Sequence, residues 1–433
     1  MNAARSTLAL VLLTVPLAAA QTPAGDSLTV RDALGLVFAN NPSLQEATQS
    51  IQASRARVEL SRSGYLPTAD IGASYVYISP IPEIVFGELS LKVAPNSNYD
   101  GHIGARQMIY DFQRTGSQVF LANSRLTLAE DSRETLKRDL AFRTAEVFYA
   151  ILFLRQSILV QEEQIRTLNE HLDITRKKID AGTAMQLDAL TTQVRVATAS
   201  TVKINLETAL RTQEIAFRRL AGLAPGAPLR LKGEFAAAPS PLQLDSLLAI
   251  ALTARIEGKA AQDAITTAKA QMDAARLSDA PSLNALVSYG FKNGYVPNLD
   301  VLRGNVLGGV ELKIPVLDGN RSRSMEEEAA ALLRGAESRR HEVDQMIQAD
   351  VEQAIAETKA AAQRVEVTEV SIEQANLAVR TARLRYEAGT VPNLDLLDAL
   401  TNQTQARLTN LQSLYDEVIS GFRLRRAIGA PVL

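Results

Sequence analysis

Residues 181–188 read Ala-Gly-Thr-Ala-Met-Gln-Leu-Asp, and residues 388–395 read Ala-Gly-Thr-Val-Pro-Asn-Leu-Asp. A long segment with apolar residues at heptad spacing precedes each copy, and a second helical segment follows each. Glycine readily takes the positive φ that closes a helix, so Gly182 and Gly389 are expected to end the long segments. The last aspartate of each stretch suits the dipole at the start of a returning helix. Both stretches are therefore predicted to be hairpin tips between antiparallel helices.

The segments before the tips are too long for a compact domain. The first is expected to be a helix over residues 112–180, which at 1.5 Å per residue would span roughly 100 Å. Its apolar seam keeps heptad spacing through Val147, Ile151, Leu154 and Ile158. This pattern predicts a tube, a stalk or a coiled coil.

The composition is that of a folded protein and excludes several functions. The chain has 433 residues, of which 46% are hydrophobic, and a net charge of −2. This balance offers no electrostatic basis for binding nucleic acid. The sequence contains no cysteine, so a disulfide framework and thiol chemistry are excluded.

The first twenty residues are expected to be a signal peptide. Arg5 supplies the positive charge, residues 8–17 form the apolar core, and the alanines at 18–20 form an A-x-A cleavage site. The predicted signal peptide therefore spans residues 1–20, and the mature protein is exported. Without a cysteine, its new N-terminus cannot carry a lipid on that residue.

The chain is predicted to be an internal duplication. Pro67 matches Pro281 at a spacing of 214 residues, whereas Asp111 matches Asp318 at a spacing of 207 residues, which then holds without a gap to the end of the first copy. The difference of seven residues therefore lies between Pro67 and Asp111. Insertions are tolerated in surface loops, so the first copy is expected to have the longer loop there.

Each copy is expected to contain a helix, a strand, a loop, a second strand, a long helix, a tip and a return helix. The predicted copies span residues 27–224 and 241–433 and are joined by a linker at 225–240. Strands are expected at 67–79, 98–110, 282–292 and 306–316, long helices at 112–180 and 319–387, and tips at 181–188 and 388–395.

The predicted strands alternate strictly between apolar and polar residues. Ile71 and Tyr75 point one way, while Asp70 and Ser74 point the other. This is the pattern of a transmembrane barrel strand with lipid outside and water inside. Four strands cannot close a barrel, and open edges are not tolerated in lipid, so the chain is expected to oligomerise.

The predicted fold class is a mixed α/β membrane protein. A trimer would form a twelve-stranded transmembrane β-barrel with four strands from each chain, continued by a long α-helical coiled-coil barrel. The alternative is a periplasmic coiled-coil structural or adaptor protein without a pore, with the strands as small hairpin insertions. Membrane fractionation would separate the two.

The sequence resembles the TolC-like outer membrane efflux proteins over essentially its whole mature length. The most specific match is Tyr-Glu-Ala-Gly-Thr at 386–390 with Leu-Asp-Leu-Leu-Asp at 394–398. Further matches are the helix break at Asn40-Asn41-Pro42, the strand entries at Pro67 and Pro281, the helix starts at Asp111 and Asp318, and the two Ala-Gly-Thr tips.

The resemblance implies a homotrimeric channel in the outer membrane of a Gram-negative bacterium that extends into the periplasm. It implies a passive exit duct of a tripartite efflux or type I secretion system. The partners would be outer membrane lipid, a periplasmic adaptor (membrane fusion protein) and an inner-membrane transporter. Drugs, metals, peptides and proteins leave through similar ducts, and the choice among them usually lies with the pump.

Two acids are predicted to form an aperture. Asp395 and Asp398 are three residues apart on the return helix, so they share a face. In a trimer each becomes a ring of three carboxylates that favours cations. By resemblance this is the periplasmic aperture, where Asp188 and Tyr386 match residues that hold neighbouring hairpins together, with an expected hydrogen bond between them. At Val391 the best-known members have a basic residue, so closure is expected to be weaker or different. The competing interpretation makes the two acids ordinary helix-start residues.

The tips are also predicted to be docking points for the adaptor. Gly182 and Gly389 lack side chains where the helices turn, so a partner's helical hairpin can approach the backbone closely. The neighbouring Thr183 and Thr390 belong to the same predicted surface. The competing interpretation is that both glycines only terminate helices.

The sequence shows no catalytic constellation, metal site or cofactor motif, so an enzyme is not expected. The three histidines are His102, on a predicted strand, and His171 and His341, on separate predicted helices. None has the spacing of a metal-binding pair. Each is expected to be a surface or lumen side chain. Without a phosphate-binding loop, the energy for export must come from a partner.

Overall fold

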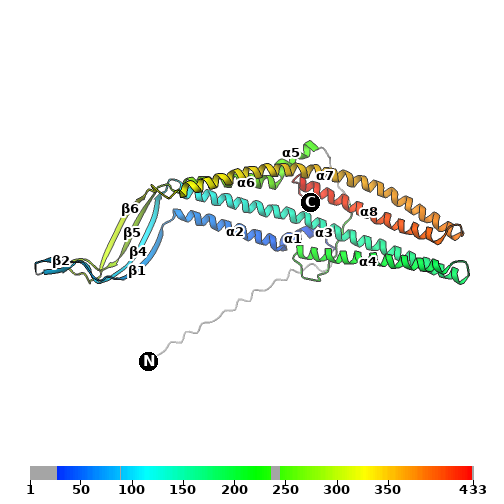
Figure 1. Cartoon of the computed structure of the whole chain (residues 1–433), viewed down its shortest axis with the longest axis horizontal. Coiled ribbons are helices and arrows are strands. Elements are labelled where there is room, and N and C mark those ends of the chain that lie inside the picture. Colours follow the sequence, from blue (N-terminus) through cyan, green and yellow to red (C-terminus); the bar gives the residue numbers. More distant parts are fainter. Residues whose placement is uncertain (1–26, 88, 236–243, 432–433) are drawn as a thin grey trace, which may run out of the picture.

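The molecule is elongated, with a small β-sheet at one end and two helical hairpin tips at the other (Figure 1). The computed structural model describes residues 27–87, 89–235 and 244–431. The predicted signal peptide at 1–20 and the end of the predicted linker, residues 236–240, lie outside the described residues.

The helices of the two copies correspond in length, at 11, 21, 67 and 35 residues. The first copy contains α1 (Val30–Asn40), α2 (Pro42–Arg62), a 3-10 turn (Ser63–Tyr65), α3 (Arg114–Asp180) and α4 (Gln186–Leu220). The second contains α5 (Leu244–Ala254), α6 (Ile256–Arg276), α7 (Arg321–Glu387) and α8 (Asn393–Ala427). Helices α3 and α4 form one antiparallel hairpin, α7 and α8 form the other, and α3 packs against α8.

Aspartates cap the two longest helices. The Asp111 carboxylate accepts a hydrogen bond from the Thr115 backbone N–H at 2.7 Å, and Asp318 accepts one from the Ser322 N–H at 2.7 Å. Each cap satisfies one of the N–H groups that a helix start leaves without a partner. The helices therefore begin three residues after each aspartate, slightly later than the predicted starts at 112 and 319.

The sheet has the order β1-β4-β5-β6, with every neighbouring pair antiparallel. Its strands are β1 (Thr68–Tyr77), β4 (Ser97–Tyr110), β5 (Ser282–Lys292) and β6 (Arg303–Lys313). One row across all four strands is Ile71, Ile103, Tyr289 and Val306. All four side chains are exposed, so the apolar residues gather on one face that none of the described residues covers.

The last strand begins earlier than predicted. Strand β6 covers Arg303–Lys313, rather than 306–316, because it pairs along the whole of β5, from Arg303 opposite Lys292 to Lys313 opposite Ser282. Pro315 follows and has no N–H to donate to a ladder. The pairing partner therefore sets the strand ends, which the alternation alone did not locate.

The longer first loop contains a second hairpin that the sequence analysis did not predict. Strands β2 (Glu83–Phe86) and β3 (Leu89–Lys92) pair antiparallel and extend beyond the main sheet (Figure 1). Gly87 adopts a φ of 64° in the turn. The corresponding loop of the second copy, residues 293–302, forms no strand. The length difference between the copies therefore falls where this hairpin lies.

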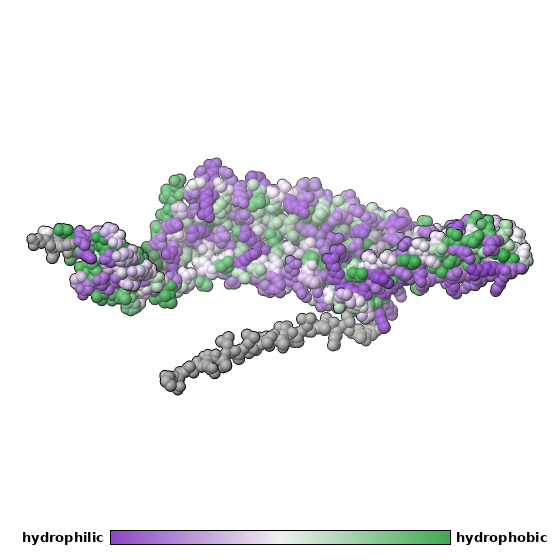
Figure 2. Space-filling model, turned by 60° about the horizontal axis from the view of Figure 1, so that its bottom comes forward, coloured by the Kyte–Doolittle hydropathy of each residue, from purple (hydrophilic) through white to green (hydrophobic). Residues whose placement is uncertain are grey.

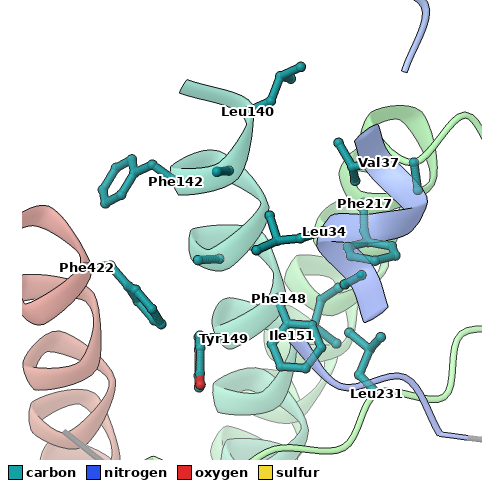
Figure 3. Close-up of a cluster of buried hydrophobic side chains, with 14 of the residues drawn as sticks. Leu34, Val37, Leu140, Phe142, Phe148, Tyr149, Ile151, Phe217, Leu231 and Phe422 are labelled. Atoms are coloured by element: carbon teal, nitrogen blue, oxygen red, sulfur yellow. The ribbon is translucent and has the colours of Figure 1, made fainter. Parts of the chain in front are cut away.

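The largest apolar core lies midway along the molecule. Figure 3 shows Phe148 and Tyr149 of α3 between Phe422 of α8 and Phe217 of α4. Tyr149 contacts both Phe148 and Phe422 with ring centroids 5.4 and 5.5 Å apart. Burial of such aromatic rings holds the two hairpins together at this level.

The described part of the predicted linker belongs to the same core. Leu229 and Leu231 are buried there, and backbone hydrogen bonds join Leu28 to Arg230 and Lys232. Residues 229–232 of the predicted linker therefore pack into the core of the first copy, because Leu229 and Leu231 alternate along this segment and contact apolar residues of the same core.

Candidate functional site at the hairpin tips

The two tips close in the same way, 207 residues apart. Gly182 and Gly389 have φ values of 73° and 72°. The next residue, Thr183 or Thr390, donates its backbone N–H to the carbonyl oxygen five residues earlier, at 2.8 and 2.9 Å. Each threonine hydroxyl also donates to that same carbonyl at 3.0 Å. The Ala-Gly-Thr sequence is thus explained: glycine takes the left-handed position and threonine satisfies an orphan carbonyl.

The backbone at both glycines is open. A Cβ placed on Gly182 or Gly389 would meet nothing within 4 Å. Large apolar side chains around the tips are exposed as well; they are Met185, Leu187, Leu384 and Leu394. Figure 2 shows hydrophobic surface gathered at this end of the molecule.

Asp188 caps the return helix α4. Its carboxylate accepts a hydrogen bond from the Met185 N–H at 3.1 Å. The expected hydrogen bond from Tyr386 to Asp188 is not among the contacts of the described residues. Tyr386 is instead buried, with its ring against His171 at 5.2 Å and the Lys178 ammonium 4.1 Å above its centre. Its contact with the first hairpin is therefore made by the ring, through packing and a cation–π interaction.

A buried polar cluster joins both hairpins beside the tips. His171 of α3 is 6% exposed, and its Nε2 lies 2.6 Å from Oδ1 of Asn393, the first residue of α8. The Asn393 amide nitrogen donates to the Asp188 carbonyl at 3.1 Å and lies 3.4 Å from the Thr192 hydroxyl on α4. Since the amide nitrogen faces a carbonyl, Oδ1 must accept from His171. The neutral imidazole therefore carries its proton on Nε2.

Burial keeps the His171 ring neutral. Desolvation lowers the pKa of His171, and the Lys178 and Arg383 charges lower it further, while the hydrogen bond to Asn393 and the Asp188 charge act in the opposite direction. No hydrogen bond to Nδ1 is found within the described residues, so a second proton there would have no acceptor.

The expectation of a surface or lumen position for His171 is wrong. His171 follows the seam residue Leu168 by three positions and precedes buried Thr175 by four, so all three share a helix face. This spacing in the sequence indicates that His171 is buried. His102 is half-exposed on β4 with its Nδ1 2.6 Å from Asp100, and His341 is exposed on α7.

The two aperture acids differ in their partners. Both lie exposed on one face of α8. Asp398 accepts a hydrogen bond from Arg195 of α4 at 2.7 Å, which links the two hairpins across the tip. No hydrogen bond or ion pair involves the Asp395 side chain in the described part of the chain. Arg195 was not predicted as a site residue; it lies seven residues after Asp188 on the same face of α4.

Val391 fills an apolar position. It packs, partly buried, against a cluster that includes Val379, Leu396 and Leu400. The side chain therefore contributes to packing within the second tip, where a basic residue would contribute charge.

Within the described residues, no group of histidine and acidic side chains has the geometry of a metal site. In the same part of the chain, no helix combines the length and the apolar character needed to cross a bilayer.

Two long helical hairpins, a four-stranded antiparallel sheet with an uncovered apolar face, and duplicated open tips are the features of an outer membrane efflux channel. The chain belongs to the outer membrane efflux protein family, whose model matches residues 33–223 and 247–430.

Individual relatives agree with this assignment. The alkaline protease secretion protein AprF of Pseudomonas aeruginosa is 22% identical over 413 residues, covering 92% of this chain and 84% of that protein. The outer membrane efflux protein BepC of Brucella suis is 22% identical over 436 residues, which cover 97% of this chain and 89% of that protein. The CmeC outer membrane channel of Campylobacter jejuni matches with a TM-score of 0.79 at 13% identity, covering 99% of this chain and 93% of that one.

The predicted fold class is confirmed: a trimeric twelve-stranded barrel, four strands per chain, continued by an α-helical barrel. The outer membrane location with an extension into the periplasm is confirmed as well. The protein is a channel and not an enzyme, and the alternative of a periplasmic coiled coil without a pore is not supported.

Proposed function

We propose that the chain is the exit duct of a tripartite efflux or type I secretion system and that its two tips are the docking points. The homotrimer works with a periplasmic adaptor and an inner-membrane transporter, and export through it is passive. The observation that carries the docking assignment is the duplicated tip: Gly182 and Gly389 present open backbone in the same conformation. Three chains would offer six equivalent contacts to an adaptor ring.

The edges of each chain support closure into a ring. Strands β1 and β6 are the sheet edges, and their backbone groups need partners inside lipid. Helices α4 and α7 flank the inner pair α3 and α8. Both flanking helices carry exposed apolar residues at heptad-like spacing; these are Leu187, Leu190, Val194 and Ile204 on α4, and Val367, Val370, Leu377 and Leu384 on α7. In the trimer, α4 of one chain faces α7 of the next.

We further propose that Asp395 and Asp398 face the pore axis and that Asp188 and Tyr386 hold the hairpins in the closed arrangement. The support is that Asp398, Tyr386 and the cluster around Asn393 each contact the first hairpin. The duplicated copies at 27–224 and 241–433 each supply one hairpin, and the leader at 1–20 directs export.

Replacing one glycine tests the docking proposal. Gly389→Asp should abolish export of a transported substrate and cross-linking to the adaptor, while the trimer persists in outer membrane fractions. The matched control is Gly226→Asp, because Gly226 also has a positive φ of 80° with nothing within 4 Å. Equal loss of export in both variants, or normal adaptor cross-linking in Gly389→Asp, would refute docking at the tips.

A further inference from the structure

A groove lies between the two hairpins, further from the hairpin ends than the tips and towards the centre of the molecule. Its walls are α3, α7 and α8, and its volume is about 500 Å³. An amide pair at its centre joins two of the walls: the Gln403 side chain of α8 donates to Asn376 of α7 at 2.7 Å. The lining is mainly polar, which distinguishes this groove from the apolar cores around it.

Three arginines line the groove: Arg380 and Arg383 from α7 and Arg407 from α8. Nothing in the described part of the chain forms a hydrogen bond or an ion pair with these three guanidinium groups. Two other arginines at this end of the molecule have carboxylate partners: Arg166 pairs with Glu163, and Arg195 pairs with Asp398.

The acid in the lining does not neutralise this charge. Glu163 borders the groove, but both of its carboxylate oxygens accept hydrogen bonds from Arg166, at 2.7 and 2.6 Å. The groove therefore keeps an excess of positive charge. Three like charges that line one concavity repel one another, and a bound anion would reduce that repulsion.

The dimensions favour a small ligand. Arg383 lies seven residues beyond Asn376 on α7, and Arg407 lies four residues beyond Gln403 on the antiparallel α8. At 1.5 Å per residue, their Cα atoms are separated by roughly 16 Å along the axis, and the long side chains can converge within that span. A volume of about 500 Å³ lies within the range of small-molecule sites.

We propose that this groove is a binding site for a small organic polyanion that carries two or more carboxylate or phosphate groups. The anion is held by Arg380 and Arg383 on one side and by Arg407 on the other, with neutral hydrogen bonds from the amide and hydroxyl groups of the lining. Arginine suits this role because its planar group binds oxyanions through two parallel N–H bonds. Each trimer would contain three such sites.

The groove borders the proposed trimer contact. Arg380 lies three residues after Leu377 and four before Leu384, the exposed apolar residues of α7 that are proposed to face a neighbouring chain. Leu377 and Leu384 themselves are not part of the lining, and every lining residue comes from one chain. Failure of anion binding would leave the docking proposal untouched, since that rests on the tips.

Calorimetric titration of the detergent-solubilised trimer at low ionic strength tests the proposal, with citrate as the polyanion and acetate as the monovalent comparison. Citrate should bind saturably at one site per chain, and acetate should bind far more weakly. Arg380→Gln and Arg407→Gln should each weaken citrate binding about tenfold to a hundredfold, as expected for a lost charge-assisted hydrogen bond.

The matched control is Arg385→Gln, because Arg385 is an exposed arginine on α7 that does not line the groove. It removes the same charge and should leave the affinity unchanged. Glutamine has nearly the same helix propensity as arginine, so these substitutions should not disturb the helices. The two test variants lie on different helices, and the test can be made if at least one of them still assembles into the trimer. The proposal is overturned if the native trimer shows no saturable citrate binding, or if Arg385→Gln weakens it as much as Arg407→Gln.

Discussion

Asp395 and Asp398 lie one helical turn apart, yet they differ in whether a neighbouring cation neutralises the carboxylate. Arg195 pairs with Asp398 at 2.7 Å, whereas the Asp395 carboxylate has no such partner in the described part of the chain. A paired carboxylate contributes less field to a pore than an unpaired one. The double ring expected from the sequence is therefore electrostatically unequal.

Single substitutions in planar bilayers should reveal this inequality. Asp395→Asn should lower cation selectivity more than Asp398→Asn does, because only the first removes an unneutralised ring. Arg195→Gln should raise cation selectivity by freeing Asp398. The measurement is the reversal potential in a salt gradient. Identical effects of the two asparagine variants would show that Arg195 does not screen Asp398 in the open channel.

The buried His171 is expected to make the tip region sensitive to pH. Its pKa lies below the ordinary value of 6.5 because burial disfavours the cation. At a pH between the lower pKa of the folded tip and the ordinary pKa of the unfolded tip, the unfolded tip binds more protons than the folded one. The free energy of unfolding therefore falls as the pH drops through 6.5, and it stops falling once the pH is below the pKa of the folded tip. Hydrogen exchange of tip peptides, corrected for intrinsic rates, should therefore be faster at about pH 5.5 than at about pH 7.5.

Two glutamine variants separate His171 from other groups. His171→Gln keeps a donor for Asn393 but cannot gain a proton, so the pH effect on exchange should shrink. His341→Gln replaces an exposed histidine on α7 and should behave like the native chain. A pH effect of native size in His171→Gln would assign it to a different titrating group.

The sequence pattern predicts the tip residues but not the contacts between them. The spacing of Asp395 and Asp398 on one face needs only the helix period, and the structure shows both exposed on α8. The partner of His171 is 222 residues away in the chain. Local pattern cannot indicate such a pairing, because it depends on how two hairpins pack after each has formed.

At the scale of elements, the duplication explains how each return helix ends. Gly222 follows α4 with a φ of 62°, and Gly429 follows α8 with a φ of 73°. A Cβ on Gly222 would come within 2.7 Å of the Asn40 carbonyl oxygen at the end of α1, and one on Gly429 within 2.8 Å of Ala254 at the end of α5. Each glycine allows a long helix to meet a short one backbone to backbone.

Gly222→Ala should destabilise the trimer by more than its backbone strain alone. A non-glycine residue in the left-handed region costs about 1–2 kcal/mol, and the close carbonyl adds a steric cost. Gly226→Ala has the same strain, at a φ of 80°, but no neighbour within 4 Å. The difference between the two midpoints of guanidinium unfolding measures the steric cost of placing a Cβ at position 222 against the Asn40 carbonyl oxygen. Equal midpoints would mean that the α1 end moves away freely.

Elements with strong periodicity were predicted well, and elements set by pairing were not. Heptad spacing and helix-ending glycines placed α3, α7 and both tips, because these signals are local. The short hairpin Glu83–Lys92 was missed, since its strands have four residues each and alternation is not resolved over that length. The early start of β6 depended on β5, and the burial of Leu231 depended on α3.

At the scale of the whole molecule, the single chain is incomplete. Ile71, Val306 and Val310 are 83%, 73% and 65% exposed on one face of the sheet, far more than a soluble surface favours. The same face meets lipid in a closed barrel, where exposed apolar residues are stable. The sheet end therefore lies in the outer membrane, and the tips, about a whole helix length away, lie in the periplasm.

This orientation predicts opposite labelling of the two ends. The hairpin β2–β3 projects from the sheet on the side away from the helices (Figure 1), so it should face the cell exterior. Because the chain contains no cysteine, Lys92→Cys and Met185→Cys each introduce a single thiol at an exposed position. On intact cells an impermeant maleimide should label Cys at position 92 and not at 185, whereas permeabilised cells should label both. Labelling of the cysteine at position 185 on intact cells would show that the orientation is the reverse and that the tips do not lie in the periplasm.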